Sequence, residues 1–257
     1  MLLRETNDHF LLIQQHDHAQ VSGVMAEHWN PAYFTGQEWR DKVILAIYHH
    51  DRGWINLDEN PFWDDKAKKP YSFVELPQNP KLAHYKLGIE EVEVMDPYAG
   101  LLCSLHYYSF IDPAISTGSQ RFIDFEKARQ QRLKKELQIF SPVQEEVLNY
   151  YLQLLKFCDN LSLYVCLIQP GATNTDNISW FKNGIPSSSF FSFTNGKNIQ
   201  ATWLSENQIQ VTPFPFIQEL TITIPYKKLI KSDISQQGLL SAFRTAPIQY
   251  QEIHLIS

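Results

Sequence analysis

Histidine is the potentially reactive side chain whose distribution along this chain is most uneven. The chain has 257 residues and nine histidines, of which only His254 lies beyond residue 106. Imidazole is the commonest metal ligand in proteins, and it titrates close to neutral pH. The crowding therefore indicates a metal-binding or acid–base site built largely from the first 106 residues. The clustered histidines are His9, His16, His18, His28, His49, His50, His84 and His106.

The most distinctive short segment is Tyr48-His49-His50-Asp51-Arg52-Gly53-Trp54. It closes a helix that the apolar spacing predicts from about residue 36 to residue 50. The histidine can offer a ring nitrogen, and the adjacent aspartate an oxygen, to one ion if the two side chains converge. A glycine two residues later can leave the helix. An ordinary helix end, with histidine near the negative pole of the dipole, is the alternative interpretation.

Three more residues with ligand chemistry lie on predicted helices. His18 lies on a helix expected over residues 16–29, and His106 follows Leu102 by four positions on an apolar helix expected over 97–110. Asp159 lies in a strongly apolar segment of a helix expected from Ser141 to about residue 168. A buried carboxylate needs a cation or a metal as partner. A metal explains Asp159 most simply; a buried arginine pair or an exposed turn are the alternatives.

In order along the chain, His18, the His50-Asp51 pair with Gly53, and Asp159 resemble the HD-domain superfamily of metal-dependent phosphohydrolases. The resemblance covers about residues 10–168 and implies that these side chains bind a divalent metal. The whole chain also looks like a bacterial family of unassigned function that shares the HDxGW segment, which is residues 50–54 here.

Related proteins with two metals include the di-iron enzyme myo-inositol oxygenase. They place two further histidines between the His-Asp pair and the last aspartate. The resemblance therefore implies that His84 and His106 are further candidate ligands. A mixed nitrogen and oxygen ligand set suits Mn, Fe, Ni or Zn, as one ion or two.

Three residues in or directly before the HDxGW segment are candidates for catalytic roles. Asp51 would help to hold the metal, and His49 would support the ligands or act as an acid or base. Arg52 would offer its guanidinium fork to a phosphate, although a solvent-exposed cation at a helix end is the simpler interpretation.

Three functions remain open from the sequence. The leading one is a metal-dependent hydrolase, specifically a phosphohydrolase acting on a small phosphorylated molecule. The second is a di-metal oxygenase that would use His84 and His106 as well. The third is a non-catalytic HD-like protein that binds a metal or a ligand. The sequence makes no prediction of oligomeric state.

Composition excludes several other classes. A hydrophobic fraction of 44% with 19% charged residues supports a sizeable core. The net charge of −6, without a basic cluster, argues against nucleic-acid binding. We see neither a signal peptide nor an apolar run of about 18 residues, so no membrane partner is expected. Cys103, Cys158 and Cys166 stand in apolar segments, which favours a reducing cytoplasm.

The predicted fold is α+β. Residues 15–168 should form a mainly helical, HD-like metal-binding domain, with an irregular proline-rich loop over 54–82 and a weak helix near 88–94. Residues 169–257 alternate in hydrophobicity, as in 199–204, 208–214, 220–225 and 248–255, which predicts an antiparallel sheet. A hairpin within residues 1–14 should join this sheet.

Aromatic residues gather between residues 29 and 71. Four of the six tryptophans lie there, and the functional interpretation is an aromatic wall that stacks on a ring of the ligand. The alternative is ordinary packing by large side chains. These tryptophans are Trp29, Trp39, Trp54 and Trp63.

Overall fold

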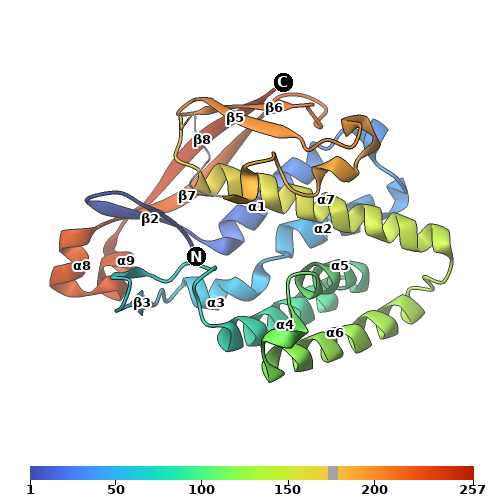
Figure 1. The fold of residues 1–257 in the computed structure, drawn as a ribbon, viewed down its shortest axis with the longest axis horizontal. Coiled ribbons are helices and arrows are strands. Elements are labelled where there is room, and N and C mark those ends of the chain that lie inside the picture. Colours follow the sequence, from blue (N-terminus) through green and yellow to red (C-terminus); the bar gives the residue numbers. More distant parts are fainter. Residues whose placement is uncertain (173–178) are drawn as a thin grey trace.

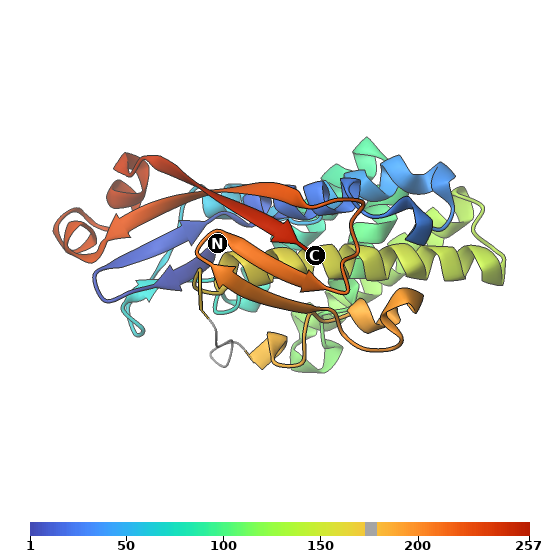
Figure 2. The same ribbon diagram turned by 90° about the horizontal axis from the view of Figure 1, so that it is seen from above.

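Helices fill most of the chain between residues 15 and 167, and a six-stranded sheet takes its strands from both ends of the chain (Figure 1). The computed structural model describes residues 1–172 and 179–257. The sheet lies along one side of the helices, with the long helix α7 running beneath it (Figures 1 and 2). The predicted α+β fold is thereby confirmed.

The sheet joins the N-terminal hairpin to the C-terminal strands, as predicted. Its order is β1-β2-β7-β8-β6-β5, and all neighbours are antiparallel except β6 and β8. The sheet is therefore mixed, and it departs from the predicted antiparallel arrangement at this one pair. The chain reverses between β6 and β7 and again between β7 and β8, so β6 and β8 run in the same direction. The strands are β1 Leu2–Glu5, β2 His9–Ile13, β5 Gln200–Ser205, β6 Gln208–Thr212, β7 Leu220–Ile230 and β8 Ile248–Ile256.

Most helices follow the predicted segments. Helix α7 begins as expected, because Ser141 and Gln144 form a capping box at its first turn. Two short helices between β7 and β8, α8 and α9, were not predicted, since seven residues are too few to show a helical period. The helices are α1 Gln15–Glu27, α2 Arg40–His49, α3 Ile55–Asp58, α4 Gln78–Met95, α5 Pro97–Tyr108, α6 Thr117–Glu136, α7 Pro142–Leu167, α8 Lys231–Gln237 and α9 Leu239–Thr245.

The proline-rich segment is more ordered than predicted. It contains α3 and a small hairpin of β3 Trp63–Asp64 with β4 Lys69–Pro70. Helix α4 then begins at Gln78, ten residues before the predicted start at 88. Pro80 lies in the first turn of α4, where a residue without an N–H loses no intrahelical bond. Proline therefore marks a helix start here rather than a loop.

One hydrophobic cluster joins the helices to the inner face of the sheet. On β7, the side chains of Leu220, Ile222 and Ile224 are buried, while those between them are exposed. Trp29 is 1% exposed and packs against aromatic rings from α7 and the C-terminal region. Trp39 stacks on Tyr98 at 4.4 Å, so both tryptophans have packing roles. The three cysteines are free and buried.

Among the described residues, no helix combines the length and the apolar character needed to cross a membrane.

A buried arginine ties α6 to α4. Arg129 is 4% exposed at its side chain and lies 3.0 Å from Glu126 Oε2, 2.6 Å from Glu93 Oε2 and 3.3 Å from Glu90 Oε1. Glu126 is fully buried, and this burial raises the pKa of its carboxyl group. Its ionised form therefore depends on the arginine for compensation.

We predict that Arg129→Met lowers the free energy of unfolding by about 3 kcal/mol, because it leaves a buried carboxylate without its cation. The matched control is Arg132→Met, since Arg132 also contacts Glu93 at 2.6 Å but is 53% exposed. Its loss should cost less than about 1 kcal/mol. Urea denaturation of both variants measures the two effects. Equal losses would contradict the role given to Arg129.

Candidate metal centre

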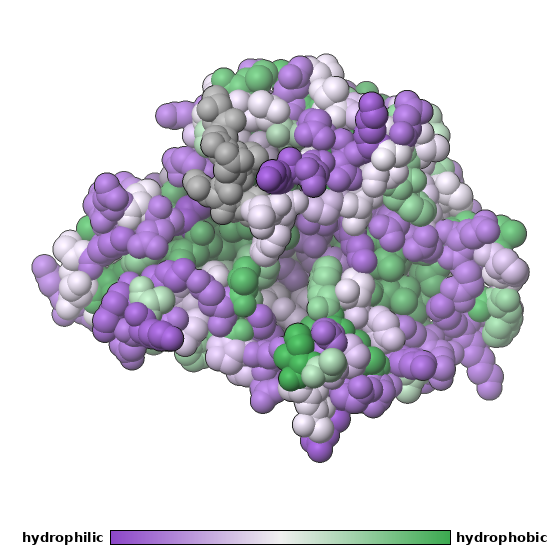
Figure 3. Space-filling model, in the orientation of Figure 1, coloured by the Kyte–Doolittle hydropathy of each residue, from purple (hydrophilic) through white to green (hydrophobic). Residues whose placement is uncertain are grey.

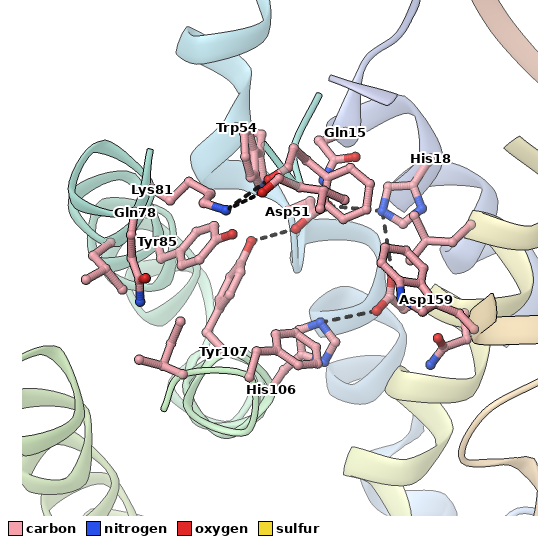
Figure 4. A pocket seen from close by; sticks show the side chains of 18 of the residues that line it. Gln15, His18, Asp51, Trp54, Gln78, Lys81, Tyr85, His106, Tyr107 and Asp159 are labelled. Carbon is pink, nitrogen blue, oxygen red and sulfur yellow. Dashed lines mark hydrogen bonds and ion pairs between the residues drawn. The ribbon is translucent and has the colours of Figure 1, made fainter. Parts of the chain in front are cut away.

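Four helical segments converge on one buried group of histidines and aspartates (Figure 4). His18 comes from α1, the pair His50 and Asp51 directly follows α2, His106 comes from α5, and Asp159 from α7. All five are buried, with exposed fractions between 0% and 7%. Residues separated by up to 141 positions therefore form one cluster in the interior.

The distances place Asp159 at the centre of the histidines. Its Oδ1 lies 3.6 Å from His18 Nε2 and 3.5 Å from His50 Nε2, and its Oδ2 lies 3.5 Å from His106 Nε2. Asp51 Oδ2 lies 3.0 Å from His18 Nε2 and 3.9 Å from His50 Nε2. Two overlapping sets could each hold a metal ion: His18, His50 and Asp51, and His50, His106 and Asp159.

These separations match the edges of a coordination polyhedron. With metal–ligand bonds of about 2.1 Å, adjacent ligand atoms are about 3.0 Å apart in an octahedron and about 3.4 Å apart in a tetrahedron. The donor set of imidazole nitrogens and carboxylate oxygens suits Mn, Fe, Ni and Zn better than Ca or Mg. The geometry and the chemistry of the cluster therefore both fit a transition-metal ion.

The hydrogen bonds of His18 and His50 turn their Nε2 atoms toward the carboxylates. Ser162 Oγ donates to the backbone oxygen of His18 at 2.7 Å, so His18 Nδ1, 2.9 Å away, must donate to Ser162 Oγ. His50 Nδ1 donates to the backbone oxygen of Ile47 at 2.7 Å. In the neutral tautomers, each Nε2 therefore directs a lone pair at carboxylate oxygens. Such an arrangement needs a proton or a cation between the groups.

Electrostatics support the same requirement. Burial alone would lower the pKa of His50, but Asp51 and Asp159 outweigh it and raise the pKa to about 9. Burial would raise the pKa values of the two aspartates, yet the histidines hold both below their usual range. Burial lowers the pKa of His106 to about 3, so this ring stays neutral. The buried His50 Nε2 has no hydrogen-bond partner among the described residues. A divalent cation would satisfy both carboxylates and this nitrogen.

Tyr107 and Ser162 support the ligands and were not predicted. Tyr107 donates a 2.5 Å hydrogen bond to Asp51 Oδ1, and the ring of Tyr85 stacks on it at 4.0 Å. Burial and the nearby Asp51 raise the pKa of Tyr107 well above its usual value, so it remains a donor. Ser162 follows Asp159 by three residues, a spacing that places both on one face of a helix. That spacing was the available signal for Ser162; nothing in the sequence linked Tyr107 to Asp51.

The glycine of the HDxGW segment allows a close crossing of two backbones. A Cβ atom on Gly53 would lie 2.2 Å from the backbone oxygen of His84, and a Cβ on Gly88 would lie 2.4 Å from the nitrogen of Gly53. The turn after Asp51 therefore packs directly on α4. This contact fixes the position from which Asp51 enters the cluster.

The structure does not bring His84 to the cluster. Its half-buried side chain lines a separate hollow with Arg52, Leu87 and Glu91, while the next residue, Tyr85, lines the cavity beside the cluster. Adjacent residues on a helix diverge by about 100°, so only one of the two can face that cavity. The prediction of His84 as a sixth ligand therefore does not agree with its position.

His49 and Arg52 also lie away from the cluster. The His49 ring stacks on His16 with ring centroids 6.0 Å apart. Arg52 Nε donates a 2.5 Å hydrogen bond to Glu91 Oε2, and its side chain is 28% exposed. Neither residue lines the cavity beside the cluster. Their predicted roles in acid–base chemistry and phosphate binding find no support in these positions.

A cavity of about 480 Å³ opens beside the cluster. His18, Asp51, His106 and Asp159 form its inner wall, and Trp54 also lines it (Figure 4). Of the four clustered tryptophans, Trp54 is thus the one that fits the predicted aromatic wall. The cavity gives a small molecule access to the buried ligands.

Comparison with known proteins identifies a family for this chain. The chain belongs to the family described as "Protein of unknown function (DUF3891)", whose family model matches residues 1–231. The match includes all five residues of the cluster. No curated protein and no solved structure matched the chain.

We predict that His50→Gln and Asp159→Asn each reduce the bound transition metal to less than about one tenth of the wild-type stoichiometry. Both variants remove a donor from the centre of the cluster. The protein would be loaded with Mn or Zn, dialysed and analysed by plasma mass spectrometry.

His84→Gln is the matched control for the loss of an imidazole. It should keep the full metal content, because His84 lines a different hollow. Retention of metal by both cluster variants, or its loss from His84→Gln, would contradict this assignment.

Proposed function

We propose that the protein is a metal-dependent phosphohydrolase that acts on a small phosphorylated molecule. The observation that supports this most strongly is the convergence of three imidazoles and two carboxylates beside an open cavity, four of whose wall residues belong to this cluster. The order of His18, His50-Asp51 and Asp159 along the chain, which resembles the HD-domain superfamily, is the second support.

One ion accounts for the cluster better than two. The two possible ligand sets share His50, whose Nδ1 already donates a hydrogen bond to the backbone oxygen of Ile47. Its remaining nitrogen has a single lone pair and can bind a single ion. Asp159 lies within 3.6 Å of all three histidines, which also indicates one shared centre. We therefore infer one Mn, Fe, Ni or Zn ion held by His18, His50, Asp51 and Asp159.

When bound, such an ion would acidify a water molecule and neutralise charge on a phosphoryl oxygen. The protein's own residues would orient and protect this chemistry. Ser162 and Tyr107 hold His18 and Asp51 in place, while His106 stays neutral and keeps a ring nitrogen facing Asp159. Because His106 also lines the cavity, it can hydrogen-bond to a substrate oxygen.

The di-metal oxygenase fits the structure less well. That interpretation needs His84 as a ligand of a second ion, and His84 lines another hollow. A non-catalytic metal-binding protein would use the same cluster, so only turnover separates it from a hydrolase. The open cavity beside the ligands favours turnover, because a structural metal site is normally closed to substrates.

We further propose that the protein works in the reducing cytoplasm on a small molecule, without nucleic acid or membrane as partner. The three buried free thiols and the acidic composition support this proposal.

The test is release of inorganic phosphate from a panel of phosphomonoesters by protein loaded with Mn, Fe, Ni or Zn. We expect turnover of at least one ester with at least one metal, and a loss of about 100-fold or more in Asp159→Asn, since an unfilled site loses the electrostatic stabilisation of the transition state. His84→Gln should retain the wild-type rate within about twofold. No release across the panel, or release unaffected by Asp159→Asn, would overturn the proposal.

A further inference from the structure

We infer that the substrate combines one anionic group with an apolar body, such as an alkyl chain or an unsubstituted aromatic ring. This inference rests on the proposed function, because it assigns the anionic group to the metal end of the cavity. It is derived from the cavity's charges, its apolar lining and the state of its polar side chains.

The charges of the lining residues limit how much negative charge the ligand can have. Two carboxylates, Asp51 and Asp159, and one ammonium, Lys81, line the cavity. A single divalent ion balances both carboxylates, which leaves Lys81 as the uncompensated cation. Within the described residues Lys81 has no ion-pair partner; its Nζ donates to the backbone oxygens of Phe73 and Val74 at 3.1 and 3.2 Å. One uncompensated positive charge suits one phosphoryl group, but it is too little to balance the negative charge of a di- or triphosphate.

Away from the metal ligands, the lining is mostly apolar and reaches the surface. Several of these side chains are unusually exposed for their size: Ile115 is 63% exposed, Phe110 54%, Val74 53% and Trp180 45%. On the face shown in Figure 3, hydrophobic side chains likewise reach the surface near a central hollow. Such a cluster at the mouth of a cavity marks a binding surface for apolar groups. The apolar lining residues are Trp54, Phe73, Val74, Leu82, Phe110, Ile111, Ile115, Leu163 and Trp180.

Several polar side chains of the cavity already donate hydrogen bonds to protein atoms. Gln78 donates to Ser119 Oγ at 2.8 Å, and Asn160 donates to the backbone oxygen of Lys156 at 2.6 Å. Tyr107 donates to Asp51, as described above. A sugar or another polyhydroxylated body would lose its hydrogen bonds to water where it lies against the mostly apolar lining. An apolar body has no such cost.

The inference can be tested with n-alkylphosphonates, from methyl to hexyl, binding to the Zn-loaded protein in titration calorimetry. Their carbon–phosphorus bond removes the ester that a phosphatase would cleave. Burial of a methylene tightens binding by about fourfold at most, so we expect about twofold or more per methylene and about 30-fold over the series. A flat series would overturn the inference. So would tighter binding of a polyhydroxylated alkylphosphonate than of its unsubstituted counterpart.

Two isoleucines of nearly equal exposure provide a matched pair of variants. Ile115→Asp places a charge at the mouth of the cavity and should reduce the hexyl-to-methyl affinity ratio by about threefold or more. Ile217 is 62% exposed and does not line this cavity, so Ile217→Asp should leave the ratio unchanged. Because the readout is a ratio, a partly unfolded sample does not mimic the effect. Equal ratios in the two variants would contradict the inference.

The result of the affinity series can be distinguished from the result of the phosphate-release test of the proposed function. A steep affinity series without hydrolysis of any phosphate ester would support the apolar body and overturn the phosphohydrolase. Hydrolysis of phosphate esters with a flat series would do the reverse.

Discussion

The interior of this protein encloses two carboxylates with which no lysine or arginine among the described residues forms an ion pair. Asp51 and Asp159 face the Nε2 atoms of His18 and His50, and hydrogen bonds to Ser162 and Ile47 fix the opposite nitrogens as donors. Without a positive charge, the lone pairs on these Nε2 atoms would repel the carboxylate oxygens, and the low dielectric constant of the interior would strengthen this repulsion. Burying these polar groups from four helical segments is unfavourable by itself. A cation bound between them would compensate for that cost.

The fold supplies the rigidity that such a cluster requires. Helix α1 packs closely on α2, because Gly23 leaves room for the ring of Tyr48. Gly53 and Gly88 let the turn after Asp51 rest on α4, and the capped helix α7 extends past the cluster to present Asp159. The sheet covers α1 and α7 through the shared hydrophobic cluster (Figures 1 and 2). Positions fixed by backbone packing, rather than by flexible loops, are those that can hold a metal reproducibly.

The sequence allowed much of this to be predicted, for identifiable reasons. His18, His50, Asp51, His106 and Asp159 stood out because histidines and a carboxylate in apolar helices need partners, and the structure brings these five together. The position of His84 could not be predicted, since it depends on the rotation of α4, whose start at Gln78 was hidden by prolines.

Contacts between distant segments could not be predicted from the sequence for a related reason. The bond from Tyr107 to Asp51 and the parallel pairing of β6 with β8 arise only when remote parts of the chain meet. The apolar mouth of the cavity could not be predicted either. Its exposed side chains come from several separate segments, so these residues form no periodic pattern along the chain.

The most direct test of the central claim is anomalous X-ray diffraction from crystals of the protein loaded with Zn or Mn. We predict one anomalous peak in the cluster, about 2.0–2.3 Å from the Nε2 atoms of His18 and His50 and from carboxylate oxygens of Asp51 and Asp159. The absence of a peak there, two peaks of full occupancy, or a peak at His84 instead would contradict the single-ion centre.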